Sequence, residues 1–414
     1  MHILYLHQYF STRDGSAGSR SYEMARYFVD QGHQVTVVFG RSSRSVSPIQ
    51  NPTYEGKGVR RGEFEGIQLI EHDLVYSSKQ SQFKRFGVMI SFALKATKHV
   101  FREDYDVLFA TSTPLTIVIP GILHRWFGFR KKRFVYESRD NWPEGLAAIG
   151  VTNKPLLRFF EILARLAANT ADACVALSPG IEQGIKKRLR KDTPVTLVPN
   201  GCDTDLFAPG SESKVALLGV KETDLVGIFT GAHGYANGLH AVLDAGAALK
   251  YRGIDDIKLV MVGDGAQKQE LIERAREDGT EDICLFIDSV PKNQLVKLMQ
   301  AADVGLMILK NLPEYYYGTS PNKFFDYIST GLPVLNNYPG WLAEIIAEHH
   351  IGIPVAPDDP ELFVDALVRF RDQKEERALM AKNARTLAVS QFSRDALAGT
   401  LLSVLEGENA NKTA

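Results

Sequence analysis

The chain alternates short apolar runs with helices, and it does so in both halves. In the first half, the run Ile3–Leu6 is followed by a polar loop, a helix expected at Ser21–Gln31 and a second apolar run, Val35–Phe39. In the second half, the runs Val226–Thr230 and Lys258–Val262 each lead into a glycine-containing loop. Such alternation is typical of a parallel sheet with helices on both faces. We therefore predict an α/β protein with two doubly wound domains.

The length and the composition place the domain boundary. A chain of 414 residues with 44% apolar and 23% charged residues is typical of a globular protein with two or three domains. The composition changes near residues 208–220. We expect a first domain at residues 1–207, a second at 208–390, and a helix and tail at 391–414 that can cross back to the first domain.

The charge is unevenly distributed between these halves. Residues 1–207 hold 28 Lys and Arg against 20 Asp and Glu, whereas the remainder holds 20 against 29. A basic half favours an anionic partner such as nucleic acid, an anionic lipid surface or a diphosphate.

Three isolated cysteines, Cys174, Cys202 and Cys284, indicate neither a disulfide framework nor a cysteine metal site. The apolar start Met1–Leu6 is too short for a signal peptide, and no apolar run is long enough to span a bilayer. We therefore expect a cytoplasmic protein.

One stretch has the character of an anion site. A polar loop from Gly318 opens a short helix that carries Lys323 and Asp326, and Gly331 ends it before a buried strand. Free N–H groups at a helix start attract phosphate, Lys323 adds a positive charge, and Asp326 can accept hydrogen bonds from a ribose diol. The alternative is an ordinary capped surface helix.

Glycine-rich loops follow several strands. Those at Gly231–Gly238 and Gly263–Gly265 would converge at one sheet edge, an arrangement that cradles a nucleoside diphosphate. In the first half, Gly15 and Gly18 lie where a dinucleotide fold has its phosphate loop. Their spacing is not that of the dinucleotide fingerprint, and no acidic residue ends the second strand, which argues against a redox cofactor.

Asp140 and Trp142 follow a strand of the first half, where open α/β sheets place their ligands, so Asp140 is a candidate for chemistry. Asp203 and Asp205 have two interpretations, a divalent-metal site or a polar turn. No other candidate ligands cluster near them, so we favour the turn and expect no metal.

Two further segments bear on the surface. Residues 41–61 are polar, serine-rich and without period, which predicts an exposed loop. From Lys79 to Arg102, apolar residues recur at helical spacing and cations take the opposite face. This basic amphipathic helix either covers the sheet as an ordinary surface helix or meets anionic lipid.

Several motifs together resemble a known family. They are Gly32–His33, Asp140–Pro143, Asn200–Asp203, Gly263–Gly265 and Ser320–Val334. These residues resemble the retaining family-4 glycosyltransferases of GT-B architecture, and within them the bacterial O-antigen and capsule L-fucosamine (N-acetyl-L-fucosaminyl) transferases. The resemblance covers nearly the whole chain.

The resemblance implies two Rossmann-like domains facing across a cleft, with the nucleotide sugar held mainly by the second domain and the acceptor by the first. With the loops above, it gives these donor-binding residues: Gly231, His233, Gly234, Asn237, Gly263, Asp264, Gly265, Pro321, Asn322, Lys323 and Asp326. On the acceptor side and its phosphate loop are Gly15, Gly18, Arg20 and Trp142. Asp140 and Lys323 are the expected catalytic residues.

The chain departs from the family pattern at two places. Where the family has two glutamates separated by seven residues, this chain has Gly318 and Asp326. The usual Arg and Lys of the second domain's first loop are absent, and His233 and Asn237 lie near their positions. Lys323 is therefore expected to supply the missing charge.

We expect a metal- and cofactor-independent glycosyltransferase that moves a sugar, by resemblance N-acetyl-L-fucosamine, from a UDP-linked donor. The acceptor would be a polyprenyl-diphosphate-linked sugar in surface polysaccharide synthesis, and the enzyme would be peripheral on the anionic inner face of the cytoplasmic membrane, with no nucleic-acid partner. One alternative is a UDP-sugar epimerase of similar two-domain fold. Another, motivated by Gly318, is a nucleotide-sugar-binding scaffold without turnover.

Overall fold

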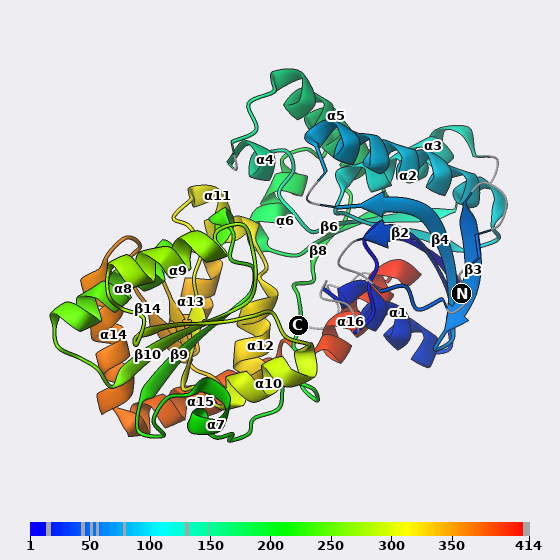
Figure 1. Ribbon diagram of the computed structural model, residues 1–414. Coiled ribbons are helices and arrows are strands. Elements are labelled where there is room, and N and C mark those ends of the chain that lie inside the picture. Colours follow the sequence, from blue (N-terminus) through cyan, green and yellow to red (C-terminus); the bar gives the residue numbers. More distant parts are fainter. Residues whose placement is uncertain are drawn as a thin grey trace. The chain divides into compact units, whose positions relative to one another are not determined.

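The chain forms two compact units, shown as a computed structural model in Figure 1. Unit 1 comprises Met1–Pro199, Gly318–Ser320 and Asp395–Ala414, and unit 2 comprises Asn200–Tyr317 and Pro321–Arg394. The structure describes residues 1–13, 18–42, 46–49, 53–54, 58–77, 80–128, 132–148 and 150–408. The units divide shortly before the change in composition near residue 208.

Unit 1 is built on one eight-stranded sheet of order β3-β4-β2-β1-β5-β6-β7-β8. Its strands are β1 (His2–Leu6), β2 (Gln34–Ser42), β3 (Val59–Phe64), β4 (Ile67–Tyr76), β5 (Val107–Thr111), β6 (Arg133–Ser138), β7 (Ala173–Ala176) and β8 (Val195–Leu197). Every pair is parallel except β3 and β4, which are antiparallel. Because β1 pairs with β2 on one side and β5 on the other, the chain direction across the sheet reverses at β1.

Helices cover both faces of this sheet. They are α1 (Arg20–Asp30), α2 (Gln82–Arg102), α3 (Ile119–Phe127), α4 (Glu144–Ala148), α5 (Lys154–Thr170), α6 (Pro179–Lys186) and α16 (Arg394–Glu406), with a 3-10 turn η1 (Leu115–Val118). Alternate residues of β1 point to opposite faces, so Leu4 and Leu6 share a core with α2, α3, α5 and α6. Ile3 and Tyr5 share the other core with α1 and α16.

The prediction of an exposed loop over residues 41–61 is wrong at its two ends. Arg41 and Ser42 continue β2 alongside β4, and β3 begins at Val59. The end of β2 has no short-range signal because it pairs with β4, which lies farther along the chain. β3 pairs with β4 in a local antiparallel hairpin, which the polar composition of the segment hid.

Unit 2 has a six-stranded, fully parallel sheet of order β11-β10-β9-β12-β13-β14. Its strands are β9 (Leu225–Thr230), β10 (Ile257–Val262), β11 (Cys284–Ile287), β12 (Val304–Met307), β13 (Val334–Asn336) and β14 (Gly352–Pro354). The expectation of two doubly wound α/β domains is confirmed.

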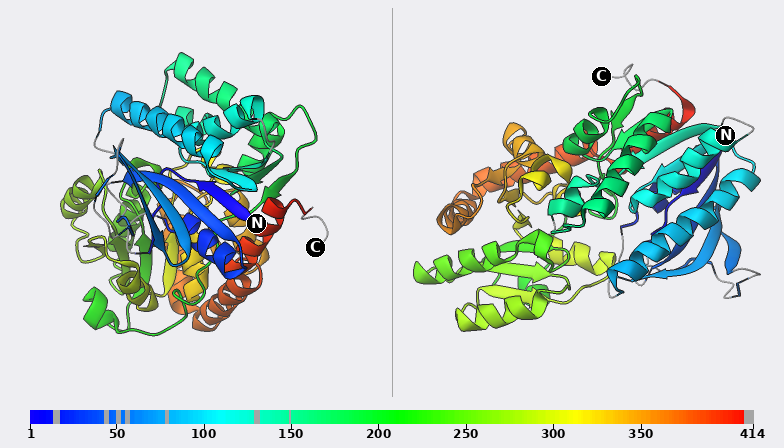
Figure 2. Two further views of the ribbon diagram at one scale, coloured as in Figure 1. Left: turned by 90° about the vertical axis from the view of Figure 1, so that its right-hand side faces the viewer. Right: turned by 90° about the horizontal axis from the view of Figure 1, so that it is seen from above.

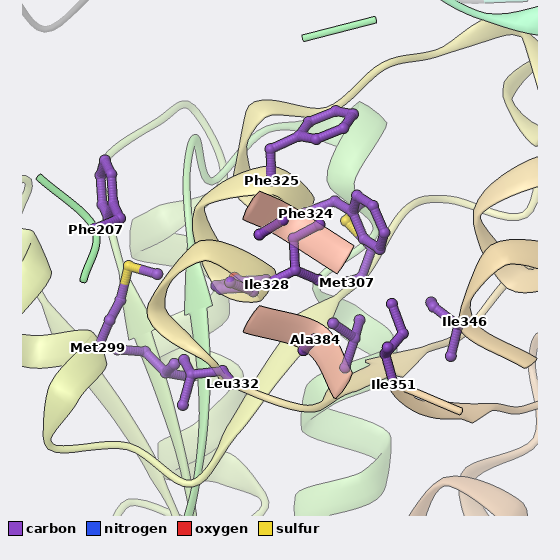
Figure 3. Close-up of a cluster of buried hydrophobic side chains, with 14 of the residues drawn as sticks. Phe207, Met299, Met307, Phe324, Phe325, Ile328, Leu332, Ile346, Ile351 and Ala384 are labelled. Carbon is purple, nitrogen blue, oxygen red and sulfur yellow. The ribbon is translucent and has the colours of Figure 1, made fainter. Parts of the chain in front are cut away.

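The helices of unit 2 lie on both sides of this sheet. They are α7 (Lys214–Leu218), α8 (His240–Tyr251), α9 (Lys268–Glu277), α10 (Lys292–Gln300), α11 (Pro313–Gly318), α12 (Asn322–Thr330), α13 (Trp341–Glu348), α14 (Pro360–Asp372) and α15 (Lys374–Ser390), with a 3-10 turn η2 (Tyr235–Asn237). Figure 3 shows Phe324, Phe325 and Ile328 of α12 among the side chains of one core. Since these three residues anchor α12, its first turn is held at a defined place.

Candidate functional site

Lys323, in the first turn of α12, links that helix to the loop that follows β9. Its Nζ donates a hydrogen bond of 2.7 Å to Oδ1 of Asn237. The same ammonium lies 4.0 Å from the centroid of the Phe229 ring, a cation–π contact from β9. Gly231 lies next to it, since a Cβ there would be 3.4 Å from Cε of Lys323. Three sequence-predicted residues, Gly231, Asn237 and Lys323, are therefore brought together.

The charge of Lys323 is poorly solvated at this place. Burial lowers its pKa from the ordinary 10.5 to about 7. The ammonium is therefore only partly charged near neutral pH, and a bound anion would favour its charged form. Lysine binds phosphate as a point charge, so the position suits a phosphoryl group.

Pro321 and Asn322 lie at the start of the same helix. Pro321 is the residue before α12, and Asn322 is its first residue and is exposed. The first N–H groups of a helix have no acceptor within it, and they carry the positive end of the helix dipole. The start of α12 thus adds backbone donors beside Lys323.

Two glycine loops interlock at the carboxyl ends of β9 and β10. The His233 N–H donates to the Asp264 carbonyl at 2.9 Å. The backbones approach so closely that a Cβ at Gly265 would lie 2.3 Å from the His233 carbonyl oxygen, and one at Gly263 would lie 1.9 Å from that of Gly231. Glycine is required at both positions, because any side chain would displace the facing loop.

The remaining predicted loop residues have local roles. Gly234 precedes η2, and its position would leave open space around a Cβ. The Asp264 carboxylate accepts from the Gly265 N–H at 2.7 Å, so it caps its own turn. Asn237 also donates from Nδ2 to the Ala232 carbonyl at 2.7 Å, which orients its Oδ1 toward Lys323.

His233 is fully buried beneath these loops. Its ring lies 6.2 Å from Phe229 and 6.1 Å from Phe286, centroid to centroid. Neither ring nitrogen has a hydrogen-bond partner within the described part of the chain. Burial, assisted by Lys268, lowers the pKa of His233 to about 4. The imidazole is therefore neutral at physiological pH and does not replace the missing arginine as a cation.

Lys268, the first residue of α9, was missed by the sequence analysis. Its Nζ donates to the carbonyls of Gly263 and Ile287 and forms a 2.5 Å ion pair with Asp288. It thereby ties the second glycine loop to the end of β11. The sequence did contain a sign of this role, because Lys268 lies at an expected helix start soon after the Gly263–Gly265 loop.

Asp326 lies one turn into α12 in a setting of mixed charge. Burial raises the pKa of its carboxyl group to about 6, while Lys292 and Arg394 oppose this rise and Asp203 adds to it. Asp203 itself accepts from Arg394 Nη1 at 2.8 Å and from the Leu206 N–H at 3.2 Å. Asp203 therefore holds a turn. Within the described residues, no group of three or more His, Cys, Asp or Glu is placed to hold a metal ion.

In unit 1, Asp140 lies just beyond the carboxyl end of β6. Its Oδ2 accepts a hydrogen bond from Thr113 Oγ1, and its carbonyl accepts from Ser138 Oγ at 3.0 Å. The neighbouring Arg139 N–H donates to Ser112 Oγ at 2.9 Å. The loops after β5 and β6 are thus joined, and the exposed Asp140 carboxylate has a fixed orientation.

A histidine that the sequence analysis missed lies at the same sheet edge. His7 follows β1, is 3% exposed, and has its Nε2 3.4 Å from Arg139 Nη1. Burial, with Arg139, lowers the pKa of His7 well below its usual range. Because β1 is the strand at which the sheet order reverses, these groups lie at the switch point where such sheets place ligands.

The other acceptor-side predictions are placed differently. Arg20 is 5% exposed and pairs with Glu137 at 2.9 Å, and it also donates to the carbonyls of Val198 and Pro199. The positive charge of Arg20 is therefore paired with a carboxylate inside unit 1. Trp142 packs on Phe160 at 4.9 Å between ring centroids. Gly18 is exposed, and Gly15 lies outside the described residues.

Two family models match the chain, one in each half. The model described as Glycosyltransferase Family 4 matches residues 17–206. The model described as Glycosyl transferases group 1 matches residues 212–387.

Curated relatives match at lower coverage. The D-inositol 3-phosphate glycosyltransferase of Corynebacterium urealyticum is 28% identical over 205 residues, or 46% of each chain. The UDP-Gal:alpha-D-GlcNAc-diphosphoundecaprenol alpha-1,3-galactosyltransferase of Escherichia coli is 28% identical over 307 residues, 70% of this chain and 73% of the relative. The chain thus spans about half the length of the first relative that it matches.

Solved structures share the fold over almost the whole chain. Sucrose-phosphate synthase of Thermosynechococcus elongatus has a TM-score of 0.77 at 17% identity, covering 98% of both chains. HepE of Anabaena, solved in complex with UDP-glucose, has a TM-score of 0.70 at 18% identity, covering 98% of this chain and 100% of HepE. At these identities the likeness concerns the fold alone, and it confirms the expected architecture.

Proposed function

Because the chain belongs to the group 1, family 4 glycosyltransferases and has their GT-B fold, we propose that it transfers a sugar from a nucleoside diphosphate to a polyprenyl-diphosphate-linked sugar. The observation that carries this proposal is the placement of Lys323 beside the loop after β9 and at the start of α12. In the reaction, the bond from the anomeric carbon to the diphosphate breaks, and a bond to an acceptor oxygen forms. By resemblance, the anomeric configuration is retained.

Unit 2 would bind the donor. Lys323 and the N–H groups of α12 would face the diphosphate, which leaves with the bonding electron pair and a growing negative charge. The backbone of the glycine loops would allow close approach, and Asp326 would accept hydrogen bonds from the ribose diol. We propose that the reaction uses neither a metal nor a cofactor, with the UDP-sugar as a substrate.

Unit 1 would bind the acceptor. The acceptor hydroxyl must lose a proton as its oxygen attacks, and the oriented carboxylate of Asp140 would take or direct that proton. Arg139 precedes Asp140 in the chain and contacts His7, and its positive charge would balance the negative charge of an acceptor diphosphate.

The finer identity of the substrates rests on relatives. The name of the Escherichia coli relative includes a UDP-linked donor and a diphosphoundecaprenol acceptor, and HepE was solved with UDP-glucose. These names support a UDP-sugar and a lipid-linked acceptor. The motif resemblance adds N-acetyl-L-fucosamine as the transferred sugar and O-antigen or capsule synthesis as the setting.

A polyprenyl tail stays in the bilayer, so the proposal includes a place in the cell. We propose a cytoplasmic enzyme that is peripheral on the inner face of the cytoplasmic membrane. Among the described helices, none has both the length and the apolar character required to cross a bilayer.

Two measurements test the proposal. Thermal-shift screening with UDP-, GDP- and dTDP-sugars should raise the unfolding midpoint with a UDP-sugar, because a ligand that binds only the folded state stabilises it. Mass spectrometry should then detect the sugar on a polyprenyl-diphosphate-linked acceptor. Conversion of the UDP-sugar without any acceptor would instead indicate an epimerase, and binding without transfer in any acceptor screen would indicate a scaffold.

A further inference from the structure

The outer side of one helical layer of unit 1 exposes large apolar side chains. We call it the α2–α3–α5 face. Its exposed apolar residues are Phe83, Leu94, Phe101, Trp126, Phe127, Phe159 and Ile162. Phe83 is 92% exposed and Phe127 is 68% exposed. Large apolar side chains that gather on one helical layer are a feature of surfaces that meet a partner.

The three helices that carry these side chains form one layer of unit 1. α2, α3 and α5 lie side by side on one face of the unit 1 sheet, as Figures 1 and 2 show. Phe92, Ala96 and Val100 of α2 are buried toward the sheet, so the stripe that holds Phe83 and Leu94 faces outward. Phe86 of α2 and Phe159 of α5 are in contact, with 5.9 Å between their ring centroids, so α2 and α5 meet directly.

The same three helices are strongly basic. α2 carries five Lys or Arg residues, α3 one and α5 three, and Glu161 of α5 is their one acidic residue. Glu161 is paired with Arg165 and Arg188 at 3.0 and 2.7 Å. The exposed cations of the face are Lys84, Lys98, Arg102, Lys154, Arg158 and Arg165.

We propose that the α2–α3–α5 face docks on a bilayer that contains anionic lipids, with Phe83, Trp126 and Phe127 entering the headgroup region. Aromatic rings prefer the interface between apolar and aqueous phases, and lysine and arginine are attracted to anionic headgroups. The expectation that the cations of α2 lie opposite its apolar residues is wrong, because Leu94 and Phe101 are exposed, as Lys98 is. The structure also adds the aromatic residues of α3 and α5. This surface deepens the proposed function, on whose lipid-linked acceptor its role in catalysis rests.

The charge of the face argues against a second copy of the chain as its partner. In a symmetric dimer the same patch meets itself, so its six exposed cations would oppose the same six. Like charges brought together across an interface are destabilising. An anionic lipid surface has the complementary charge and also accepts the aromatic rings.

The first test is sedimentation of the full-length protein with vesicles, without nucleotide sugar or acceptor. The parent should bind vesicles containing phosphatidylglycerol much more strongly than neutral ones, and 1 M salt should weaken binding without abolishing it, since the aromatic contribution is not screened. Lys98→Glu/Arg102→Glu should reduce partitioning by at least about tenfold. Phe83→Ala/Phe127→Ala should reduce it by about tenfold and remove the salt-resistant part.

A matched control comes from unit 2. Tyr251→Ala/Leu379→Ala removes side chains that are 91% and 57% exposed, and it should leave vesicle binding unchanged. If the parent does not sediment with anionic vesicles at low salt, or if Phe83→Ala/Phe127→Ala binds like the parent, the proposal is overturned. It is also overturned if the face binds an oligonucleotide or a second copy of the chain instead of vesicles.

The second test uses Trp126, which is 53% exposed. Its emission should shift to the blue on addition of anionic vesicles, and Trp126→Phe should lose this shift. Because neither test needs turnover, a protein that docks but transfers no sugar would refute the proposed function alone. A protein that transfers sugar to a water-soluble acceptor but does not bind vesicles would refute the docking face alone.

Discussion

Burial makes the charged form of Lys323, in the candidate donor site, less favourable than that of an exposed lysine. An exposed lysine is fully charged at neutral pH, whereas Lys323 has its pKa lowered to about 7 between the Phe229 ring and Asn237. The sequence indicated Lys323, because a cation at a helix start after a Pro-Asn loop is a recognisable anion signal. It could not indicate the contact with Asn237, because that residue is 86 positions away and only the fold brings the two together.

The affinity for a nucleotide sugar should depend on the protonation of Lys323. The bound diphosphate favours the ammonium form, so affinity should be highest below the pKa of about 7 and fall as the pH rises above it. Between pH 7 and 9 the dissociation constant should increase by up to about tenfold per pH unit. Isothermal titration calorimetry with a UDP-sugar checks this, since its phosphates do not titrate in that range. Lys323→Met should bind weakly and with little pH dependence, and a parent profile that is flat from pH 6 to 9 would contradict the account.

Asp326 provides a second residue-scale prediction, in which stability and binding change in opposite directions. Its folded pKa of about 6 lies above the ordinary aspartate value, so the stability that it contributes is fully present below about pH 4 and is lost as the pH rises through 6. Asp326→Asn should therefore increase the free energy of unfolding at pH 7 by up to about 3 kcal/mol, which raises the unfolding midpoint. Near pH 4 the substitution should give no gain in stability.

The same substitution should weaken donor binding, because the amide accepts fewer hydrogen bonds from a ribose diol. The donor KM should rise more than kcat falls. Thermal unfolding at pH 4 and 7, with steady-state kinetics, measures both effects. A lower midpoint at pH 7 with an unchanged KM would instead identify Asp326 as a structural partner of Arg394.

At the scale of elements, the glycine loops and the strands before them were predictable, whereas long-range pairings were not. Apolar runs ending in Gly231 and Gly263 predicted strand-to-loop turns, and these turns are present. Arg20 was expected in a phosphate loop because of its neighbours in sequence. Its buried partner Glu137 is 117 residues away and gave no local signal. The end of β2 was missed for the same reason, since its partner β4 lies farther along the chain.

The interlocked loops lead to a prediction for Gly265→Ala. The added Cβ would lie 2.3 Å from the His233 carbonyl oxygen, so one loop must move. We expect a loss of about 1–3 kcal/mol of stability and a donor affinity that falls by about tenfold or more. Calorimetry of donor binding, with circular dichroism to confirm the fold, measures the effect. Gly87→Ala is the control, because nothing lies within 4 Å of its added Cβ; equal donor affinities for the two variants would separate the loop from the donor site.

At the scale of the whole molecule, the end of the chain belongs to the unit in which the chain begins. Leu397, Leu401 and Leu405 of α16 are buried in the core that also holds Ile3 and Phe28. The change in composition near residue 208 and the repeated strand–helix pattern predicted two domains. The packing of α16 could be named only as an option, because a helix pattern shows an apolar face and not the sheet that covers it.

Leu401→Ala should destabilise unit 1 selectively. The side chain is fully buried, so its truncation should cost about 2–5 kcal/mol. Because the proposed donor site lies in unit 2, the dissociation constant for a UDP-sugar should remain within about twofold of the parent at temperatures where both variants are folded. Leu379→Ala, at a residue that is 57% exposed, is the control and should change stability little. A large loss of donor affinity in Leu401→Ala would contradict the assignment of donor binding to unit 2.

The most direct test of the central claim is the transfer of a radiolabelled sugar from a UDP-sugar to a polyprenyl-diphosphate-linked acceptor. The parent should produce labelled lipid-linked product. Lys323→Ala should lower kcat by about 100-fold or more while the protein stays folded, because the proposed stabiliser of the departing diphosphate is lost. Equal rates for the two proteins at saturating donor would contradict the account.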